Sequence, residues 1–254
     1  MTQQPPSSNL YSEVALDAAP LDTPQRALAI GAHPDDIEFG AGGTIAKWAA
    51  AGCAVTMLIV TDGSKGTWDA GMSSDSLIAK RKKEQRAAAA ALGVTEIRHL
   101  DEIDGELEYS TQLRKEMCRQ IREVAPDVVL SHDPWQRYQL HPDHRVTGWA
   151  VMDGVVSARD HLFYPEQGLE AHRPAAVLLW SADQPNHFED IAETFDTKVS
   201  ALLCHSSQGT TTMGGAEQNH GNRRAFVEKM RRWVQEQGRP HGLGAAESFR
   251  RITP

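Results

Sequence analysis

Segments that resemble buried strands alternate with helix-forming segments along this chain, and that alternation limits the possible folds more than any other feature. Five segments are predicted as strands, at residues 26–32, 54–60, 95–100, 127–132 and 175–181. Helix formers dominate the segments between and after them, at residues 40–51, 76–92, 110–124, from 144 to about 159, 190–204 and 222–237. Apolar strands joined by helices are typical of a parallel sheet with helices on both faces. The predicted fold is therefore α/β, Rossmann-like and doubly wound, with a mostly parallel sheet.

The length of 254 residues suits one α/β domain of generous size. We expect residues 1–23 to form an N-terminal arm and residues 24–254 a single domain, with a C-terminal loop and helix region from about residue 206. The arm lacks the basic start and apolar run of a signal peptide, and no segment has the length and apolarity of a membrane helix.

The number of cysteines and the net charge indicate the redox compartment of the protein and the class of partner that it binds. The 3 cysteines, Cys53, Cys118 and Cys204, are widely spaced, so a disulfide framework and a cysteine zinc cluster are both disfavoured. We therefore expect a reducing, cytoplasmic setting. The formal net charge of -8 argues against nucleic acid or an anionic membrane as the main partner.

Two tetrapeptides rich in ionisable side chains follow the first and the fourth predicted strands. HPDD at 33–36 supplies one imidazole and two carboxylates, and HPDH at 141–144 supplies two imidazoles and one carboxylate. In the usual doubly wound order, the first and fourth strands are neighbours at the topological switch point, where ligands bind beyond the carboxyl ends of the strands. Two motifs over a hundred residues apart should therefore meet in one crevice.

The side chains of these two tetrapeptides suit a metal site. Two histidines and one aspartate form a three-ligand set that leaves a coordination position open, as catalytic zinc sites do. Nitrogen and carboxylate donors without thiolate suit Zn²⁺, with Fe²⁺ or Co²⁺ as substitutes. The alternative is that each His-Pro-Asp triplet only caps a turn. Adjacent Asp35 and Asp36 repel each other unless a cation or donor is near, so a purely structural role has to account for that cost.

The motifs AHPDD and HPDHR resemble those of the LmbE-like, or PIG-L, family of zinc-dependent de-N-acetylases. That family includes deacetylases of mycothiol and bacillithiol biosynthesis and of glycosylphosphatidylinositol precursors. Further similar segments are GAGGT at 40–44, RKKEQRAAAAALGV at 81–94, DGEL at 104–107, PDVVLSH at 126–132 and KVSALLCHSSQ at 198–208. The similarity covers most of the chain from about residue 26.

The resemblance implies a role for each ionisable residue of the two motifs. The implied ligands of the Zn²⁺ cofactor are His33, Asp36 and His144. The implied catalytic residues are Asp35 as general base, His141 as electrophile or acid, and Asp143 as the residue that orients His141.

Five residues outside the metal set are candidates for substrate binding, namely Glu38, Arg81, Trp135, Tyr138 and His205. For Glu38 the alternative is a carboxylate in the first turn of a helix, where the helix dipole favours it. For Arg81 the alternative is a surface ion pair with Glu84, three residues away. His205 could instead be structural. We also expect the loops at 62–75, 133–140 and 206–221 to surround the crevice, with Trp68 as a further stacking surface for a sugar.

The chain departs from the family pattern at two places. Many members place Glu directly after the first motif, whereas this chain has Ile37 and then Glu38. Some thiol-pathway members carry Tyr two residues before the second motif, where this chain has Gln139. Both departures bear on substrate placement and leave the metal assignment unchanged.

Three glycines after the first motif, Gly40, Gly42 and Gly43, could suggest a phosphate-binding loop. The spacing G-x-G-x-x-G is missing, however, and HPDD occupies the turn where a dinucleotide fingerprint would lie. We therefore favour close packing of a helix on a strand as the reason for these glycines.

The resemblance implies hydrolysis of an amide, with removal of an N-acetyl group from an N-acetylglucosamine-type amino sugar or its conjugate. One alternative is a thiol-conjugate amidase that uses the same zinc site. Another is a sugar-binding homologue without catalysis, although binding alone requires neither Asp35 nor His141. The expected partner is a small amino-sugar substrate, and the chain could form a homo-oligomer.

Overall fold

The computed structural model describes residues 21–254, so the expected arm at residues 1–23 lies outside the described residues except for its last three. The strands are β1 (Arg26–Gly31), β2 (Ala54–Thr61), β3 (Glu96–Glu102), β4 (Val128–His132), β5 (Ala176–Trp180), β6 (His187–Asp190) and β7 (Ala246–Ile252). The helices are α1 (Asp36–Ala50), α2 (Ser74–Ala91), α3 (Thr111–Val124), α4 (Pro142–Arg159), α5 (Phe195–Leu202) and α6 (His220–Gly238). No helix among these is both long and apolar enough to span a membrane.

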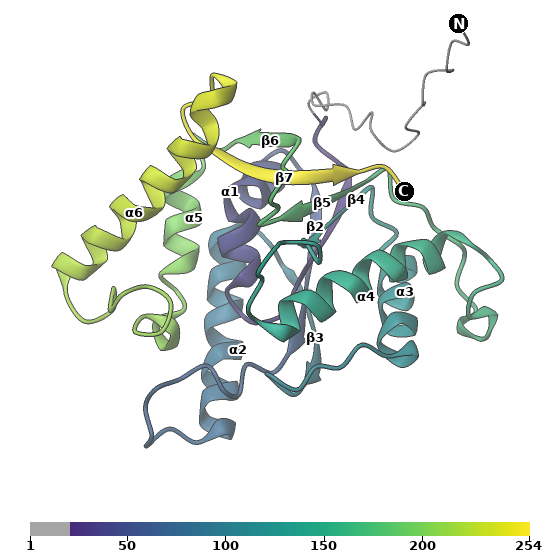
Figure 1. Ribbon diagram of the computed structural model, residues 1–254, viewed down its shortest axis with the longest axis horizontal. Coiled ribbons are helices and arrows are strands. Elements are labelled where there is room, and N and C mark those ends of the chain that lie inside the picture. The colour runs from purple at the N-terminus through teal and green to yellow at the C-terminus, as the bar shows by residue number, and fades with distance from the viewer. Residues whose placement is uncertain (1–20) are drawn as a thin grey trace, which may run out of the picture.

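The strands form one sheet in the order β3-β2-β1-β4-β5-β7-β6. The first five are parallel to one another, whereas β7 runs antiparallel to both β5 and β6. The expected doubly wound, mostly parallel sheet is confirmed (Figure 1). The expected adjacency of the first and fourth strands is confirmed as well, because β1 and β4 pair from Ala27 opposite Val128 to Ile30 opposite Ser131.

Two strands were missing from the sequence prediction, and one predicted helix was too long. Residues 190–204 were expected to be helical, but β6 ends at Asp190 and α5 begins only at Phe195. The strand β7 has the sequence AESFRRI, whose charged residues hide the apolar pattern of a strand. Both strands pair antiparallel with β7 or β5 and contain a buried glutamate that forms an ion pair with a lysine. A pattern search for apolar runs therefore passes over them.

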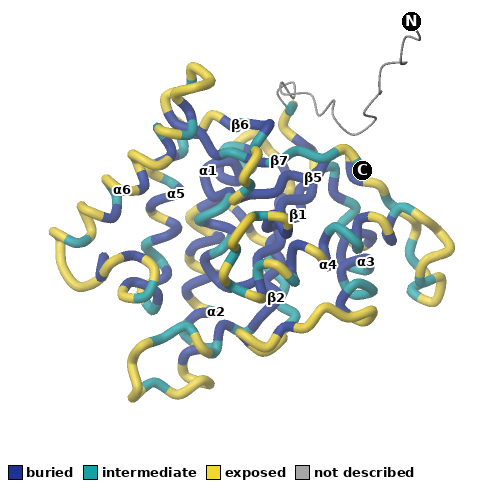
Figure 2. The backbone as a smooth tube through the Cα atoms, viewed as in Figure 1, coloured by how far each residue is buried: buried dark blue, intermediate teal, exposed yellow. Residues whose placement is uncertain are grey.

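The sheet separates two apolar clusters, and Figure 2 shows that its central strands are buried. On one face, α1, α2 and α5 pack against the strands through residues such as Trp48, Ala88 and Ala201. On the other face, α3 and α4 contribute Met117 and Val151 to a second buried cluster. A third cluster joins α6 to α5, so the C-terminal helix covers the first layer from outside. The central strand β1 is buried along almost its whole length.

The glycines at the start of α1 allow very close packing. A Cβ on Gly40 would lie 2.4 Å from Cδ2 of Trp180, and a Cβ on Gly43 would lie 2.8 Å from the side chain of Ile191. The packing role expected for these glycines is thus confirmed. Gly40 matters most, because the indole of Trp180 that fills the space above it also donates a hydrogen bond to His132.

We expect Gly40→Ala to lower the free energy of unfolding by about 1–3 kcal/mol, the usual cost of overpacking. Alanine favours a helix over glycine by about 1 kcal/mol, so a net loss means that the clash with Trp180 outweighs that gain. Urea denaturation measures the difference. Gly244→Ala is the matched control, because the nearest atom to its added Cβ lies 4.0 Å away. Equal stability of the two variants would show that the indole can move aside at little cost.

Candidate metal centre and active site

The two HPD motifs occupy the turns at the carboxyl ends of the neighbouring strands β1 and β4, as expected. In the first turn, Oδ2 of Asp36 accepts a hydrogen bond from the backbone N–H of His33 at 2.7 Å. In the second, His141 caps α4, and its Nδ1 accepts the backbone N–H of Asp143 at 3.3 Å. Pro142 occupies the first turn of that helix, where its missing N–H costs nothing. Each motif is therefore held by its own helix start.

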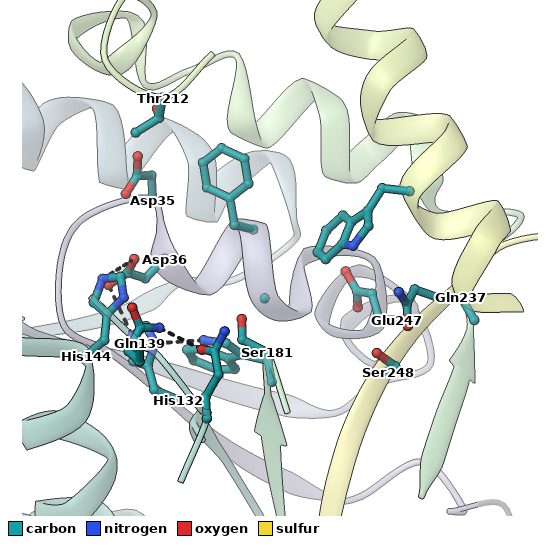
Figure 3. A pocket seen from close by; sticks show the side chains of 16 residues that line it. Asp35, Asp36, His132, Gln139, His144, Ser181, Thr212, Gln237, Glu247 and Ser248 are labelled. Atoms are coloured by element: carbon teal, nitrogen blue, oxygen red, sulfur yellow. Dashed lines mark hydrogen bonds and ion pairs between the residues drawn. The ribbon is translucent and has the colours of Figure 1, made fainter. Parts of the chain in front are cut away.

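The three side chains expected as metal ligands meet at one point. Nδ1 of His33 lies 3.2 Å from Nε2 of His144 and 3.3 Å from Oδ2 of Asp36. Nε2 of His144 lies 3.2 Å from Oδ1 of Asp36, and Figure 3 shows these two side chains facing each other. A tetrahedral zinc ion with bonds of about 2.0–2.1 Å separates its ligands by roughly 3.4 Å. The donor atoms are thus spaced for a metal ion.

Two carboxylates hold the imidazole of His33 from behind. Its Nε2 lies 3.0 Å from Oδ2 of Asp143 and 3.1 Å from Oδ1 of Asp104. Burial alone lowers the pKa of His33, but its carboxylate partners outweigh burial and raise that pKa well above the usual range. Hydrogen bonds to these carboxylates keep one proton on Nε2, so that when Nδ1 loses its proton to a metal ion its lone pair is directed at the other two donors, the arrangement typical of histidine ligands.

The expected partner of Asp143 has to be corrected. Its carboxylate binds His33 and the backbone N–H of Gly105, at 2.7 Å for the latter, whereas His141 receives only its backbone N–H. The first turn of α4 directs the side chain of Asp143 inward toward β1, while His141 precedes the helix and faces the cavity. Asp143 therefore orients His33.

His132, at the end of β4, supports Asp36. The indole N–H of Trp180 donates to Nδ1 of His132 at 3.0 Å, so a neutral His132 carries its proton on Nε2. That Nε2 lies 3.2 Å from Oδ2 of Asp36. Burial lowers the pKa of His132 to about 4, which keeps the ring neutral. His132 thus acts as a hydrogen-bonded neighbour of the donor set, and its Nε2 also lies 3.3 Å from the backbone nitrogen of Ala32.

Electrostatics separate the two adjacent aspartates. Burial raises the pKa of Asp36, yet the imidazoles of His144 and His132 outweigh it and hold that pKa well below the usual range. Burial raises the pKa of Asp35 to about 6, with Arg81 opposing and Asp36 adding to the shift. Asp36 is thus a permanent anion, whereas Asp35 can accept and release a proton near neutral pH.

Asp35 is held in an unusual backbone conformation. Its φ of 98° lies in the left-handed region, which costs a non-glycine residue about 1–3 kcal/mol. Its N–H donates to Oε1 of Gln85 at 3.3 Å, and its Oδ1 lies 3.6 Å from a guanidinium nitrogen of Arg81. Its Oδ2 is buried and has no hydrogen-bond partner among the described residues.

Arg81 is buried next to Asp35, so the alternative of a surface ion pair with Glu84 is wrong. The guanidinium donates to the carbonyl oxygens of Pro34 at 2.6 Å and Gly63 at 3.1 Å. Glu84 instead accepts hydrogen bonds from Ser206 and Ser207. Arg81 braces the HPDD turn and also contributes to the wall of a cavity.

Glu38 and His205 lie behind the site and contact each other. Both are completely buried, and Nε2 of His205 lies 3.6 Å from Oε1 of Glu38. The same carboxylate oxygen accepts the side-chain amide of Gln85 at 2.6 Å, and Gln85 in turn binds the backbone of Asp35. Neither residue lines a cavity beside the metal centre, so direct substrate contact, which the sequence suggested, has no support from their placement.

The aromatic candidates divide into two groups. Trp68 is largely exposed and lines a cavity together with His33 and His141. Trp135 packs edge-on against Trp149, with ring centroids 4.9 Å apart, and lines a different cavity. Tyr138 is 93% exposed and lines none of these cavities. The loop at 133–140 does reach the site, but through Gln136 and Gln139.

Two cavities meet at the metal centre. One, of about 320 Å³, extends from Asp36 and His144 toward α6 and β7, and Figure 3 shows it. The other, of about 340 Å³, lies on the side of Trp68 and His141. They share the residues Asp35, Asp36, His144 and Thr212. A substrate bound across both would place its middle at the donor set.

Sequence reasoning missed Asp104, Gln85 and Trp180 as parts of the site. Asp104 had a detectable signal, because it follows β3, a parallel strand whose carboxyl end lies at the same sheet edge. Gln85 lies within a helix and Trp180 at the end of an apolar strand. The sequence around each residue therefore looks like that of an ordinary core segment and gives no sign of a functional role. Only the packing of α2 and β5 brings them to the two motifs.

Comparisons with known proteins agree with this geometry. The family model described as GlcNAc-PI de-N-acetylase (PIG-L) matches residues 28–155. The chain is 38% identical to the diacetylchitobiose deacetylase of Thermococcus kodakarensis, over 74% of this chain and 72% of that protein. It is 28% identical to a probable N-acetyl-alpha-D-glucosaminyl L-malate deacetylase 2 of Bacillus anthracis, over 72% and 81% of the two chains. The structure of N,N'-diacetylchitobiose deacetylase from Pyrococcus horikoshii superimposes with a TM-score of 0.82 at 32% identity, covering 91% of this chain and 84% of that one.

The hydrogen bond from His132 to Asp36 generates a prediction about metal affinity. We expect His132→Ala to weaken Zn²⁺ binding by about 10–100-fold, because Asp36 loses the donor that orients its carboxylate. Competition with a chromophoric chelator measures the dissociation constant. His161→Ala, at an exposed position, is the control. Wild-type affinity in both variants would mean that the backbone turn alone positions Asp36.

Proposed function

Because this chain belongs to the PIG-L (GlcNAc-PI de-N-acetylase) family, we propose that it removes the N-acetyl group from an N-acetylglucosamine-type sugar or conjugate with the help of one Zn²⁺ ion. The observation that carries the proposal is the convergence of the side chains of His33, Asp36 and His144 at mutual distances of 3.2–3.3 Å. Related deacetylases act on diacetylchitobiose and on N-acetylglucosaminyl malate, which share the N-acetylglucosamine unit.

His33, Asp36 and His144 are the proposed ligands. This set of two imidazoles and one carboxylate suits Zn²⁺, and three protein ligands leave one coordination position open for water or substrate. With two neutral imidazoles and one carboxylate, the site around a bound dication would keep a net positive charge. When bound, the ion supplies Lewis acidity, which polarises a carbonyl group and acidifies water. The groups of His132, Asp104 and Asp143 keep the three ligands in their orientations.

Asp35 is the proposed general base. It lies where the two cavities meet, next to a ligand of the metal, and its pKa of about 6 allows it to accept a proton at neutral pH. The backbone of Asp35 is strained, and its Oδ2 is buried without a hydrogen-bond partner among the described residues. Both features lower the stability of the fold. Such strain is typical of functional residues.

His141 is the proposed electrophile. Burial and the nearby imidazoles of His33 and His144 lower its pKa, so the ring carries a single proton. Because Nδ1 accepts the backbone N–H of Asp143, that proton sits on Nε2. An N–H group facing the cavity can stabilise the negative charge that develops on the amide oxygen. Asp35 would take a proton from the water that adds to the amide carbon, and when the C–N bond breaks Asp35 would pass that proton to the departing amine.

Two observations weigh against a binding protein without catalysis. Holding a sugar requires neither a residue at φ 98° nor a carboxyl group whose pKa lies near neutrality. The cost of both features is understandable only if Asp35 handles a proton. A thiol-conjugate amidase would use the same metal centre and the same base, and would differ only in the groups that fill the two cavities.

The direct test is amine release from N,N'-diacetylchitobiose and N-acetylglucosamine by the zinc-loaded protein. Asp35→Asn should keep the metal and lower kcat by about 10²–10⁴-fold, the usual worth of a positioned general base. Asp36→Ala should lose the metal, because a charged ligand is removed. Metal content per chain is measured on the same samples by mass spectrometry.

Asp75→Asn, an exposed change at the start of α2, is the control and should match the wild type in both measurements. Loss of zinc from Asp35→Asn with retention in Asp36→Ala would reverse the two roles. Normal turnover in both variants would contradict the proposed mechanism altogether.

A further inference from the structure

The cavity of about 320 Å³ has a far wall that is built from the C-terminal part of the chain. Trp233 and Gln237 come from α6 and Ser248 from β7. Figure 3 shows Gln237 and Ser248 on the side of the cavity away from Asp36 and His144. The match to the family model ends at residue 155, so this wall lies outside it. The metal end and the wall end of the cavity therefore have different origins in the chain. Its volume lies within the range of about 300–1,000 Å³ for small-molecule sites.

The wall offers hydrogen-bonding groups that have no partner in the protein. Within the part of the chain that the structure describes, the side chains of Gln237, Ser248 and Ser181 make no hydrogen bond. Gln136 adds an amide that only accepts, from Gln139 at 2.7 Å, so its NH₂ group is also available. These amides and hydroxyls can donate as well as accept, which suits the hydroxyl groups of a sugar. An alkyl chain would leave all of them unsatisfied.

The charges near this wall neutralise each other and leave no cation for a ligand. Glu247 accepts the backbone N–H groups of Gly43 at 2.9 Å and Thr44 at 2.8 Å, and it pairs with the fully buried Lys198. Among residues 21–254, no lysine or arginine lines the cavity, whereas Asp35 and Asp36 line its other end. A carboxylate or phosphate bound at the wall would lie beside the carboxylate of Glu247 without a lysine or arginine in the cavity lining, and the proposed Zn²⁺ would lie at the opposite end of the cavity.

An aromatic surface completes the wall. The indole of Trp233 is 39% exposed, and Nζ of Lys198 lies 5.3 Å from its ring centroid. This cation–π contact holds the ring from the buried side and leaves its other parts open. Phe39 and Trp180 also line the cavity. Rigid rings beside a few polar groups are the usual composition of a site for a small organic ligand.

We propose that this cavity binds an uncharged sugar unit attached to the N-acetylglucosamine that is deacetylated, with Gln237, Ser248 and Trp233 as the residues that select it. The inference rests on the proposed function, and it adds that neutral oligosaccharides are preferred over conjugates that carry a carboxylate or phosphate. The second cavity, on the side of Trp68, remains for the other end of the substrate.

The first test compares a disaccharide with a monosaccharide. In Gln237→Ala, the ratio of kcat/KM for N,N'-diacetylchitobiose to that for N-acetylglucosamine should fall about 3–10-fold, the worth of one net hydrogen bond. Calorimetric titration with chitobiose should show the same loss of affinity. Gln235→Ala is the matched control, since it changes the same residue type on the same helix away from the cavity, and it should leave both values unchanged. An unaltered ratio in Gln237→Ala overturns the proposal.

The second test is a gain of function, which misfolding cannot imitate. The wild type should hydrolyse N-acetylglucosaminyl malate at least 10-fold less efficiently than N,N'-diacetylchitobiose, and Gln237→Arg should narrow that gap by supplying a cation. Equal efficiency of the wild type on both substrates contradicts the inference. So does a faster reaction with N-octanoylglucosamine that Trp233→Ala abolishes, because the cavity would then hold the acyl chain.

A wrong assignment of the enzyme activity can be distinguished from a wrong assignment of the sugar site. If the zinc-loaded protein releases amine from none of these sugars, the assignment as a deacetylase is wrong. In that case, calorimetric titration with chitobiose still tests whether the cavity binds a sugar. Weaker binding of chitobiose to Gln237→Ala than to Gln235→Ala supports the sugar site, and equal binding to both variants refutes it.

Discussion

The parallel pairing of β1 with β4 is the constraint on which the rest of the structure depends. Their register, with Ile30 opposite Ser131, makes both strands end at the same level of the sheet. The hydroxyl of Ser131 donates to the carbonyl of Ile30 at 2.9 Å, and directly beyond it the backbone nitrogen of Ala32 lies 3.3 Å from Nε2 of His132. Two loops separated by about a hundred residues thus turn toward each other. A slip of one residue would reverse the faces of both buried strands, so the apolar core on each side enforces the geometry of the site.

The cluster that this pairing creates is electrostatically unfavourable by itself. Asp35, Asp36, Asp104 and Asp143 approach one another in a largely buried space, where like charges interact strongly. The imidazole of His33 contacts three of these carboxylates and offsets part of the repulsion. A dication at the donor set would offset more of it. The pKa values of the two adjacent aspartates move in opposite directions, which is the pattern of a site that divides binding and proton transfer between neighbours.

The sequence predicted the parts of the site that follow from strand order, and it failed where loop conformation or helix packing decides. The two motifs could be placed because apolar strands announce β1 and β4. The positions of Trp135 and Tyr138 could not be predicted from strand order, because the conformation of their loop decides them. Tyr138 has a φ of 61° and points outward, whereas Gln136 and Gln139 of the same loop line the cavity. Glu38 was expected either to contact substrate or to lie in the first turn of a helix, but the tight packing of α1 buries it against Gln85. Antiparallel β7 escaped notice because its buried Glu247 breaks the apolar pattern that reveals a strand.

That same Glu247 explains how the C-terminal elements are attached to the catalytic half. Its carboxylate reaches into the middle of α1, the helix that begins with Asp36, and pairs there with Lys198 of α5. Removing one partner of a buried ion pair strands the other charge, at a cost of about 3–5 kcal/mol. The attachment therefore tolerates little change. Gln237, on the cavity side of α6, takes no part in that ion pair and is reached by solvent. Substrate preference can thus change on this wall while the metal centre and the helix that carries it stay fixed.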